Sequence, residues 1–212
     1  MARALALGLL VGFPIAASPG PMFFLVLRRT VARGWRSGLI SGLGIATGDA
    51  IYAALAAFGV AAATAFLISE RRGIGLVGGI AIALIGVRIV VRSAGPHPDP
   101  PPHPGEGKDR ALSGAYLSTL ALTLGNPPTI LSFAAIFAGL RLRVDAGWPP
   151  AVALVIGVML GSALWWVLLT GVVARLRGRT TPDISRGISA VAGVALIGFG
   201  LVAAVSSSVR PG

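Results

Sequence analysis

Long stretches without charged residues, separated by clusters of arginine, constrain this chain more than any other feature. About 20 consecutive apolar residues cross a lipid bilayer as a helix. Six stretches approach or exceed that length, so the sequence predicts six transmembrane helices. The third is the shortest, and it reaches the required length only if Arg88 extends its charged end to the membrane interface. The stretches are 4–27, 37–69 (which contains one charge, Asp49), 73–91, 111–140, 146–174 and 187–209.

The composition excludes most soluble functions. Charged residues make up 12% of the chain and hydrophobic residues 55%, whereas a soluble domain has about 25% charged residues. The absence of cysteine excludes disulfide scaffolds, thiol chemistry and cysteine-based metal clusters. The sequence contains no phosphate-binding loop, no Ser/His/Asp set and no HExxH-type cluster. We therefore expect no enzyme, no catalytic residue, no cofactor and no bound metal.

The positive charge is distributed as in a membrane protein. The net charge is +11, but the basic residues lie between the predicted spans, so no nucleic-acid partner is expected. Twelve of the 18 Lys and Arg residues fall in the first, third and fifth loops. Because cytoplasmic loops are enriched in Lys and Arg, this distribution predicts a multi-pass inner-membrane protein with both termini extracytoplasmic.

The first span has an alternative interpretation as a signal peptide, because Ala16-Ala17-Ser18 resembles a cleavage site. However, the apolar stretch continues to Leu27, and Pro19 would directly follow the cut, which disfavours cleavage. We therefore expect this segment to be retained as the first helix.

A proline-rich segment separates the third and fourth spans, with six prolines in the fifteen residues 94–108. Such segments remain extended and solvated. The segment contains His97, Asp99 and His103, which could form a metal site, but an extended linker does not fix ligands in place. The predicted organisation is a first three-helix repeat over 1–93, a cytoplasmic linker over 94–110 and a second three-helix repeat over 111–212.

The two halves show signs of an internal repeat. Each half contains three spans, and because three is odd, two similar halves must be inverted relative to each other in the membrane. Small secondary transporters are commonly built from such inverted repeats, with the substrate site at the midplane. An offset of 113 residues aligns Gly34-Trp35 with Gly147-Trp148, Gly44 with Gly157, and Gly48 with Gly161, while an offset of 107–108 aligns Pro19 and Pro21 with Pro127 and Pro128.

Two proline motifs interrupt predicted spans well inside the membrane. Proline removes a backbone donor and clashes with the preceding turn, and freed backbone groups in lipid need partners from the protein or from water. Ser18 and Asn126 are candidates to provide some of these partners. Broken helices at equivalent positions would expose half-helix N-termini that bind an anion such as a carboxylate; the alternative is two kinks that only serve packing. The motifs are Ser18-Pro19-Gly20-Pro21 in the first span and Asn126-Pro127-Pro128 in the fourth.

Asp49 is the only carboxylate within a predicted span, about one turn into the membrane. An acid in that position is costly and indicates a function, here carrying a proton or pairing with a cationic amino group. The alternative is an inert acid paired with a loop arginine. Trp166 lies deep in the fifth span, where it is predicted either to line the transport pathway or to contact lipid.

Small residues recur at spacings that allow close packing of helices. Trp35 and Trp148, at span entrances, are predicted to anchor the helices at the interface. The glycine spacings predicted to serve packing are Gly8/Gly12, Gly34/Gly38/Gly42, Gly44/Gly48, Gly75/Gly79 and Gly157/Gly161.

Residues 12–63 resemble the N-terminal signature of the LysE/RhtB amino-acid exporters. The similarity extends along the chain, with six spans, a variable hydrophilic loop after the third, and an Asn-Pro motif in the fourth. Pro128 stands where the family commonly has lysine. The matching residues are Pro19-Gly20-Pro21, the basic stretch leading into Gly34, Arg36 and Gly38, then Gly44, Gly48, Asp49 and Gly59.

The resemblance implies an all-α polytopic protein with six helices in two inverted repeats that exports amino acids or their derivatives, driven by the proton motive force. Its motif residues carry over onto Pro19, Gly20, Pro21, Asp49, Asn126 and Pro127. We interpret the chain as a secondary transporter working by alternating access. The expected partners are a small amino-acid-like substrate, a coupling proton and the lipid bilayer, with a second copy of the chain as a candidate for a homodimer. The alternatives are a divalent-cation exporter of the same superfamily and a non-transporting membrane scaffold.

Overall fold

The computed structural model describes residues 1–58, 70–94, 107–126, 129–133, 148–177 and 182–208. All regular structure in these segments is helical. The helices are α1 (Ala2–Ala17), α2 (Pro21–Arg33), α3 (Trp35–Ala57), α5 (Arg71–Ala94), α6 (Gly107–Leu124), α8 (Trp148–Arg177) and α9 (Pro182–Ser208).

Four of these helices, namely α3, α5, α8 and α9, are long and apolar enough to cross a membrane individually. The pair α1 and α2 meets the same criteria together, although its two parts are bent by 75° at the break between them. An all-helical polytopic membrane protein is thereby confirmed, with four or five candidate spans among the described residues. The predicted span 111–140 corresponds to α6 and a helical segment at 129–133, and residues 134–140 lie outside the described part of the chain.

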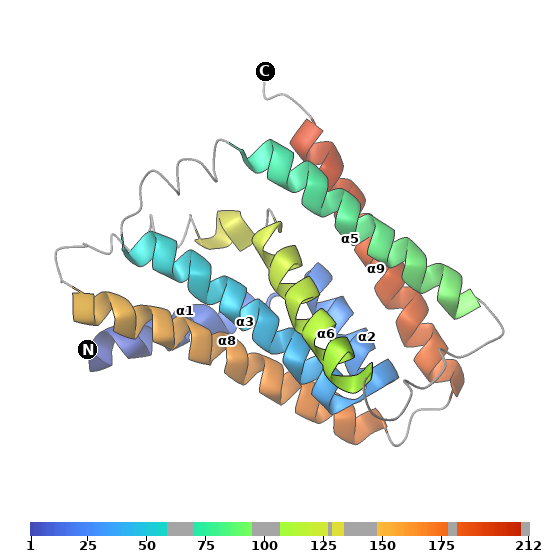
Figure 1. The fold of residues 1–212 in the computed structure, drawn as a ribbon, viewed down its shortest axis with the longest axis horizontal. Coiled ribbons are helices and arrows are strands. Elements are labelled where there is room, and N and C mark those ends of the chain that lie inside the picture. Colours follow the sequence, from blue (N-terminus) through green and yellow to red (C-terminus); the bar gives the residue numbers. More distant parts are fainter. Residues whose placement is uncertain (59–69, 95–106, 127–128, 134–147, 178–181, 209–212) are drawn as a thin grey trace.

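The helices form two groups connected through α2 (Figure 1). In one group α8 packs against α1 and α3, and α3 also packs against α6. In the other group α5 and α9 lie side by side along most of their length. Helix α2 packs against α3, α8 and α9, and it therefore joins the two groups.

Glycines bring the backbones of α1 and α8 into direct contact, as their spacing predicts. A Cβ on Gly8 would lie 2.8 Å from Gly157 Cα, and a Cβ on Gly12 would lie 2.8 Å from Val158 Cα. Because residues further along α1 meet residues further along α8, the two helices run parallel. In lipid, where helix association depends on van der Waals contact, such small residues allow the closest approach.

The pairs α3/α8 and α5/α9 run in opposite directions. Gly38 of α3 lies against Thr170, and Gly42, one turn later, lies against the Trp166 ring one turn earlier in α8. In the second pair, a Cβ on Gly79 would lie 2.7 Å from the carbonyl oxygen of Gly200, and a Cβ on Gly86 would lie 2.7 Å from that of Gly193. Together with the parallel pair α1/α8 and the pair α3/α6, these antiparallel pairs join the two halves of the sequence.

Gly34 has a different role from the packing role that its spacing predicts. It lies between α2 and α3 with φ of 91°, a conformation that residues with a Cβ rarely adopt. Its N–H donates to the Thr30 carbonyl and closes the end of α2. The prediction that Gly34 serves helix packing is therefore wrong: it makes the turn between two helices.

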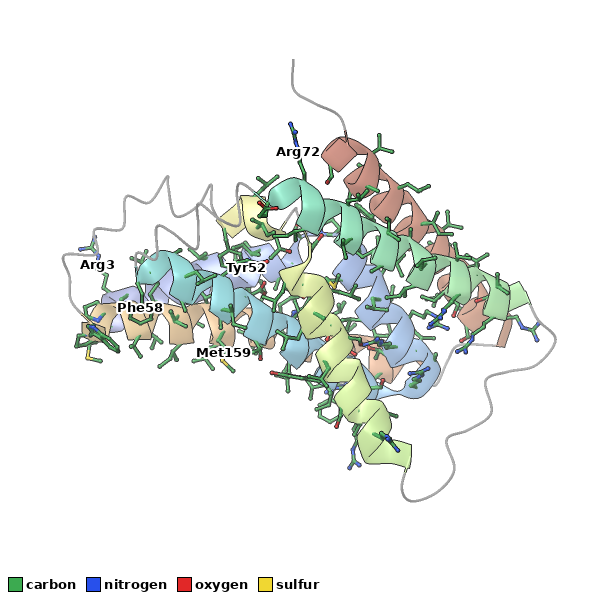
Figure 2. All side chains as sticks on the ribbon, turned by 45° about the horizontal axis from the view of Figure 1, so that its top comes forward. Arg3, Tyr52, Phe58, Arg72 and Met159 are labelled. Carbon is green, nitrogen blue, oxygen red and sulfur yellow. The ribbon has the colours of Figure 1, made fainter. Side chains whose placement is uncertain are left out.

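Many large apolar side chains of α5, α8 and α9 are exposed on the outside of the bundle, as expected for lipid-facing helices. The charged side chains labelled in Figure 2, Arg3 and Arg72, lie near the first residues of α1 and α5, at the periphery. Trp35 and Trp148 begin α3 and α8 and are exposed, consistent with anchors at the interface.

Candidate functional site

The first helix is broken at the predicted motif. Helix α1 ends at Ala17, α2 begins at Pro21, and Ser18 and Gly20 between them have extended backbone conformations. Pro21 occupies the first position of α2, where its missing N–H costs nothing because the first turn of a helix has no intrahelical acceptors. The break is thus confirmed, and the 75° bend makes it much more than a kink.

No side chain caps the N-terminus of α2. The first intrahelical bond runs from the Phe24 N–H to the Gly20 carbonyl, so the N–H groups of Met22 and Phe23 point out of the helix end. Ser18 is exposed and makes no cap. The structure shows no hydrogen bond from the Ser18 side chain to the freed backbone of the described residues, so the predicted role of Ser18 stays a prediction. A helix end of this kind favours an anionic group.

The second break lies at Gly125–Asn126, directly after α6. Asn126 is buried, its carbonyl accepts from the N–H groups of Thr129 and Ile130, and its side-chain Nδ2 donates to Thr129 Oγ1 at 2.8 Å. Asn126 therefore begins the next helical segment through its backbone carbonyl, while its side chain bonds to the Thr129 hydroxyl and not to a freed backbone group. Pro127 and Pro128 lie outside the described residues.

Tyr52 supports this second break, a role that the sequence does not reveal. Its hydroxyl donates to the carbonyl of Leu124, the last residue of α6, at 2.6 Å. In Figure 2 Tyr52 lies in the interior of the molecule, where its ring stacks on Phe133. The bond satisfies one of the carbonyls that the break deprives of an intrahelical partner.

We expect Tyr52→Phe to destabilise the protein by about 0.5–1.5 kcal/mol, because it leaves the half-buried Leu124 carbonyl without this donor. Thermal unfolding of the purified protein in detergent would measure the effect. Tyr116→Phe is the matched control: its hydroxyl donates to Thr47 Oγ1, which has its own bond to Leu43. An equal loss in both variants would contradict a special role for Tyr52.

Asp49 lies in the interior, between α3 and α8. It is 2% exposed, and the Ser162 hydroxyl donates to its Oδ2 at 2.7 Å. Asp49 is about two turns from the end of α3 at Ala57. Within the described residues its side-chain partner is this hydroxyl and no arginine, which counts against an inert ion pair.

Trp166, the remaining predicted site residue, is 1% exposed and lies one turn after Ser162 in α8. Its ring packs on Gly42 of α3 and belongs to the main hydrophobic cluster, together with Leu25 and Ile82. Its indole N–H has no partner among the described residues. The structure therefore excludes contact of Trp166 with lipid, one of its two predicted roles.

Arg29 lies within helix α2 and contacts two other helices, although the sequence predicts that it lies in the first loop. Arg28 and Arg29 belong to α2, because that helix continues to Arg33, whereas the pattern of charges predicts a loop there. Arg29 donates to acceptors on two other helices, Ser41 of α3 and Ser118 of α6. The predicted loop hid this position: in a helix, Arg29 follows the buried residues Leu25 and Val26 at spacings of four and three and so lies on their face.

Within the described residues no group of three or more His, Asp and Glu side chains could hold a metal ion. His97 and His103, the predicted alternative site, lie outside those residues. Among the described residues, Asp49, Asn126 and Arg29 are each shown with hydroxyl partners of their own.

Comparison with known proteins gives one family and several relatives. The LysE type translocator family matches residues 13–207. The chain is 30% identical over 182 residues to the uncharacterized membrane protein YahN of Escherichia coli, covering 84% of this chain and 80% of YahN. It is 32% identical over 193 residues to the chemotactic transduction protein ChpE of Pseudomonas aeruginosa, covering 90% of this chain and 92% of ChpE. No solved structure matches significantly.

Proposed function

Because the chain belongs to the LysE type translocator family, we propose that this membrane transporter exports amino acids or their derivatives from the cytoplasm by alternating access. The observation that carries the proposal is a carboxylate buried between the two halves of the bundle: Asp49 of α3 faces Ser162 of α8. An acid kept in the interior without an ion-pair partner among the described residues can accept a proton or an amino group.

The directions of the helices support six crossings of the membrane. Successive crossings of the membrane alternate in direction. Helix α8 runs parallel to α1 and antiparallel to α3. If α1–α2 and α3 are the first two crossings, α8 must be an odd-numbered one. If α5 is the third crossing, α8 is the fifth when one crossing lies between them. Helix α6 and the helical segment at 129–133 lie at that place in the chain.

The contacts between the halves support an inverted repeat. Asp49 and Ser162 are 113 residues apart, the offset at which the two halves align, and they contact each other. Gly86 and Gly193, 107 residues apart, also lie against each other. Equivalent residues meet in this way near a two-fold axis that relates two repeats, which is where secondary transporters bind their substrate.

In this mechanism the substrate carboxylate occupies the broken-helix ends at Gly20–Pro21 and Asn126. The orphan N–H groups of Met22 and Phe23 and the positive end of α2 provide its binding energy. Asp49 receives the amino group or the coupling proton. Proton coupling would allow the acid to be neutral in one half of the cycle and charged in the other.

The test is a comparison of extracellular and intracellular metabolites in cells with and without the protein. We expect one or more amino acids or derivatives to accumulate in cells that lack it and to appear in the medium when it is overproduced. An unchanged amino-acid profile together with altered divalent-cation content would favour the cation exporter instead. That alternative needs several oxygen or nitrogen ligands around the ion.

We further propose that both termini are extracytoplasmic and that the segment 94–110 is cytoplasmic. Because the chain contains no cysteine, a single Cys at position 105 can be labelled selectively. We expect this Cys to react with a membrane-impermeant maleimide only after the membrane has been opened. Labelling in intact cells would reverse the proposed orientation.

The proline-rich linker between the two repeats is proposed to have no part in transport. We expect deletion of residues 98–104 to leave the export rate within about twofold of wild type, because solvated proline-rich segments contribute little to packing. Export assays normalised to the amount of protein in the membrane would measure this. Loss of export at normal protein levels would give the linker or its histidines a role.

A further inference from the structure

The Arg29 side chain forms a bridge from the last turns of α2 to α3 and α6. Its Nη1 donates to Ser41 Oγ and to the Ala115 carbonyl, and its Nη2 donates to Ser118 Oγ, each at 2.9 Å. Ser41 and Ala115 are buried. The guanidinium is therefore held in the interior by three acceptors from two helices.

This bridge connects the two halves of the chain. Helix α2 packs mainly against α3, α8 and α9, while α6 packs mainly against α3. The two bonds to Ala115 and Ser118 thus carry the contact between α2, from the first half, and α6, from the second. Breaking them would leave the bond to Ser41 in place and free α6 from α2.

All three acceptors are neutral. Arg29 forms no ion pair with any described residue, and Arg28 and Arg33 on the same helix add further positive charge. The Ala115 carbonyl compensates this cation in part, but no described anion does, and cations near the membrane interior are costly. The planar guanidinium fork matches a carboxylate with two parallel bonds, which are stronger than bonds to hydroxyls.

We propose that Arg29 binds the carboxylate of a small solute that enters from the side of the α2–α3 turn, exchanging its bonds to Ser118 and Ala115 for the carboxylate. Binding then removes the direct hydrogen bonds between α2 and α6, so that the two helices can move apart while α3 still packs against both. The inference rests on the proposed export of an amino-acid-like solute. It adds an entry site distinct from Asp49 and the broken-helix ends.

The experiment measures the distance between α2 and α6 by electron paramagnetic resonance. Ala32 and Gly114 are exposed, and a side chain at Gly114 meets nothing within 4 Å, so cysteines at these positions can carry spin labels in the cysteine-free chain. The protein is reconstituted in lipid nanodiscs and treated with excess sodium acetate as the minimal carboxylate. Acetamide, its neutral isostere, and sodium chloride are the controls.

We expect acetate to lengthen the distance by several ångströms in the wild-type background, while acetamide and chloride leave it unchanged. Arg29→Gln should show the long distance under all three conditions. Arg33→Gln, which removes a charge from the exposed next turn of the same helix, should behave like wild type. A short distance between the labels on α2 and α6 in Arg29→Gln would overturn the proposal. Equal effects of acetate and chloride on wild type would also overturn it, and so would a long distance in Arg29→Gln with no response of wild type to acetate.

If Arg29→Gln does not fold, Ser118→Ala provides the second variant. It keeps the cation but removes one of its acceptors, so we expect the distance to lengthen at lower acetate concentrations than in wild type. An unchanged acetate response would count against the exchange. Because acetate binding is measured without transport, these results remain separate from the metabolite comparison that tests export of amino acids.

Discussion

Replacing Asp49 by Asn is expected to abolish export, leaving transport at the level of cells without the protein, while the amount of folded protein in the membrane stays unchanged. Asn is nearly isosteric with Asp, and its side-chain oxygen can still accept the 2.7 Å bond from Ser162. The free energy of unfolding should therefore change by no more than about 1 kcal/mol, the size of one hydrogen bond. What the substitution removes is the group that can gain a proton or pair with an amine.

Ser162→Ala is the matched control, because it removes the other partner of the same bond and keeps the carboxylate. We expect this variant to retain substantial export. If Asp49 served only to hold α3 against α8, Asp49→Asn would keep the bond from Ser162 and retain export, whereas Ser162→Ala would lose the bond and impair export and stability. Had the acid been half of a buried ion pair, its replacement would cost about 3–5 kcal/mol. Export at the wild-type rate by Asp49→Asn would refute the mechanism.

The second large effect is expected from Gly12→Ala. The added Cβ would overlap the Val158 carbonyl oxygen and lie 2.8 Å from Val158 Cα. Because backbone atoms cannot rotate away as a side chain can, α1 and α8 must separate. Overpacking of this kind costs about 1–3 kcal/mol, and it outweighs the gain of up to about 1 kcal/mol in helix propensity. Thermal unfolding in detergent and the yield of monodisperse protein would report it.

Gly198→Ala in α9 is the control that measures the gain in helix propensity without a steric clash. Gly198 is exposed, and a Cβ there meets nothing within 4 Å. This control should be neutral or slightly stabilising. Equal behaviour of the two variants would show that the α1–α8 contact is looser than the structure indicates.

The local breaks in the helices could be predicted from the sequence because they depend on residues next to each other. A single proline, Pro14, is accommodated within α1, but Pro19 and Pro21 on either side of Gly20 strongly disfavour a continuous helix, and the structure has α1 end before them and α2 begin at Pro21. The number of spans was harder to predict. Hydropathy treats 111–140 as one stretch, whereas α6 ends at Leu124 and does not qualify as a span by itself.

Hydropathy and proline geometry are local properties, and they are enough to establish a helical membrane protein with a broken first helix and one acid, Asp49, inside a span. The roles of the polar groups depend on contacts between distant residues, which the fold creates. It paired Asp49 with Ser162, 113 residues away, directed Tyr52 to the end of α6, and turned Arg29 from a presumed loop charge into a bridge to α6. Such contacts depend on which helix faces are brought together by glycine-mediated packing, and neither charge nor hydropathy along the chain encodes that choice.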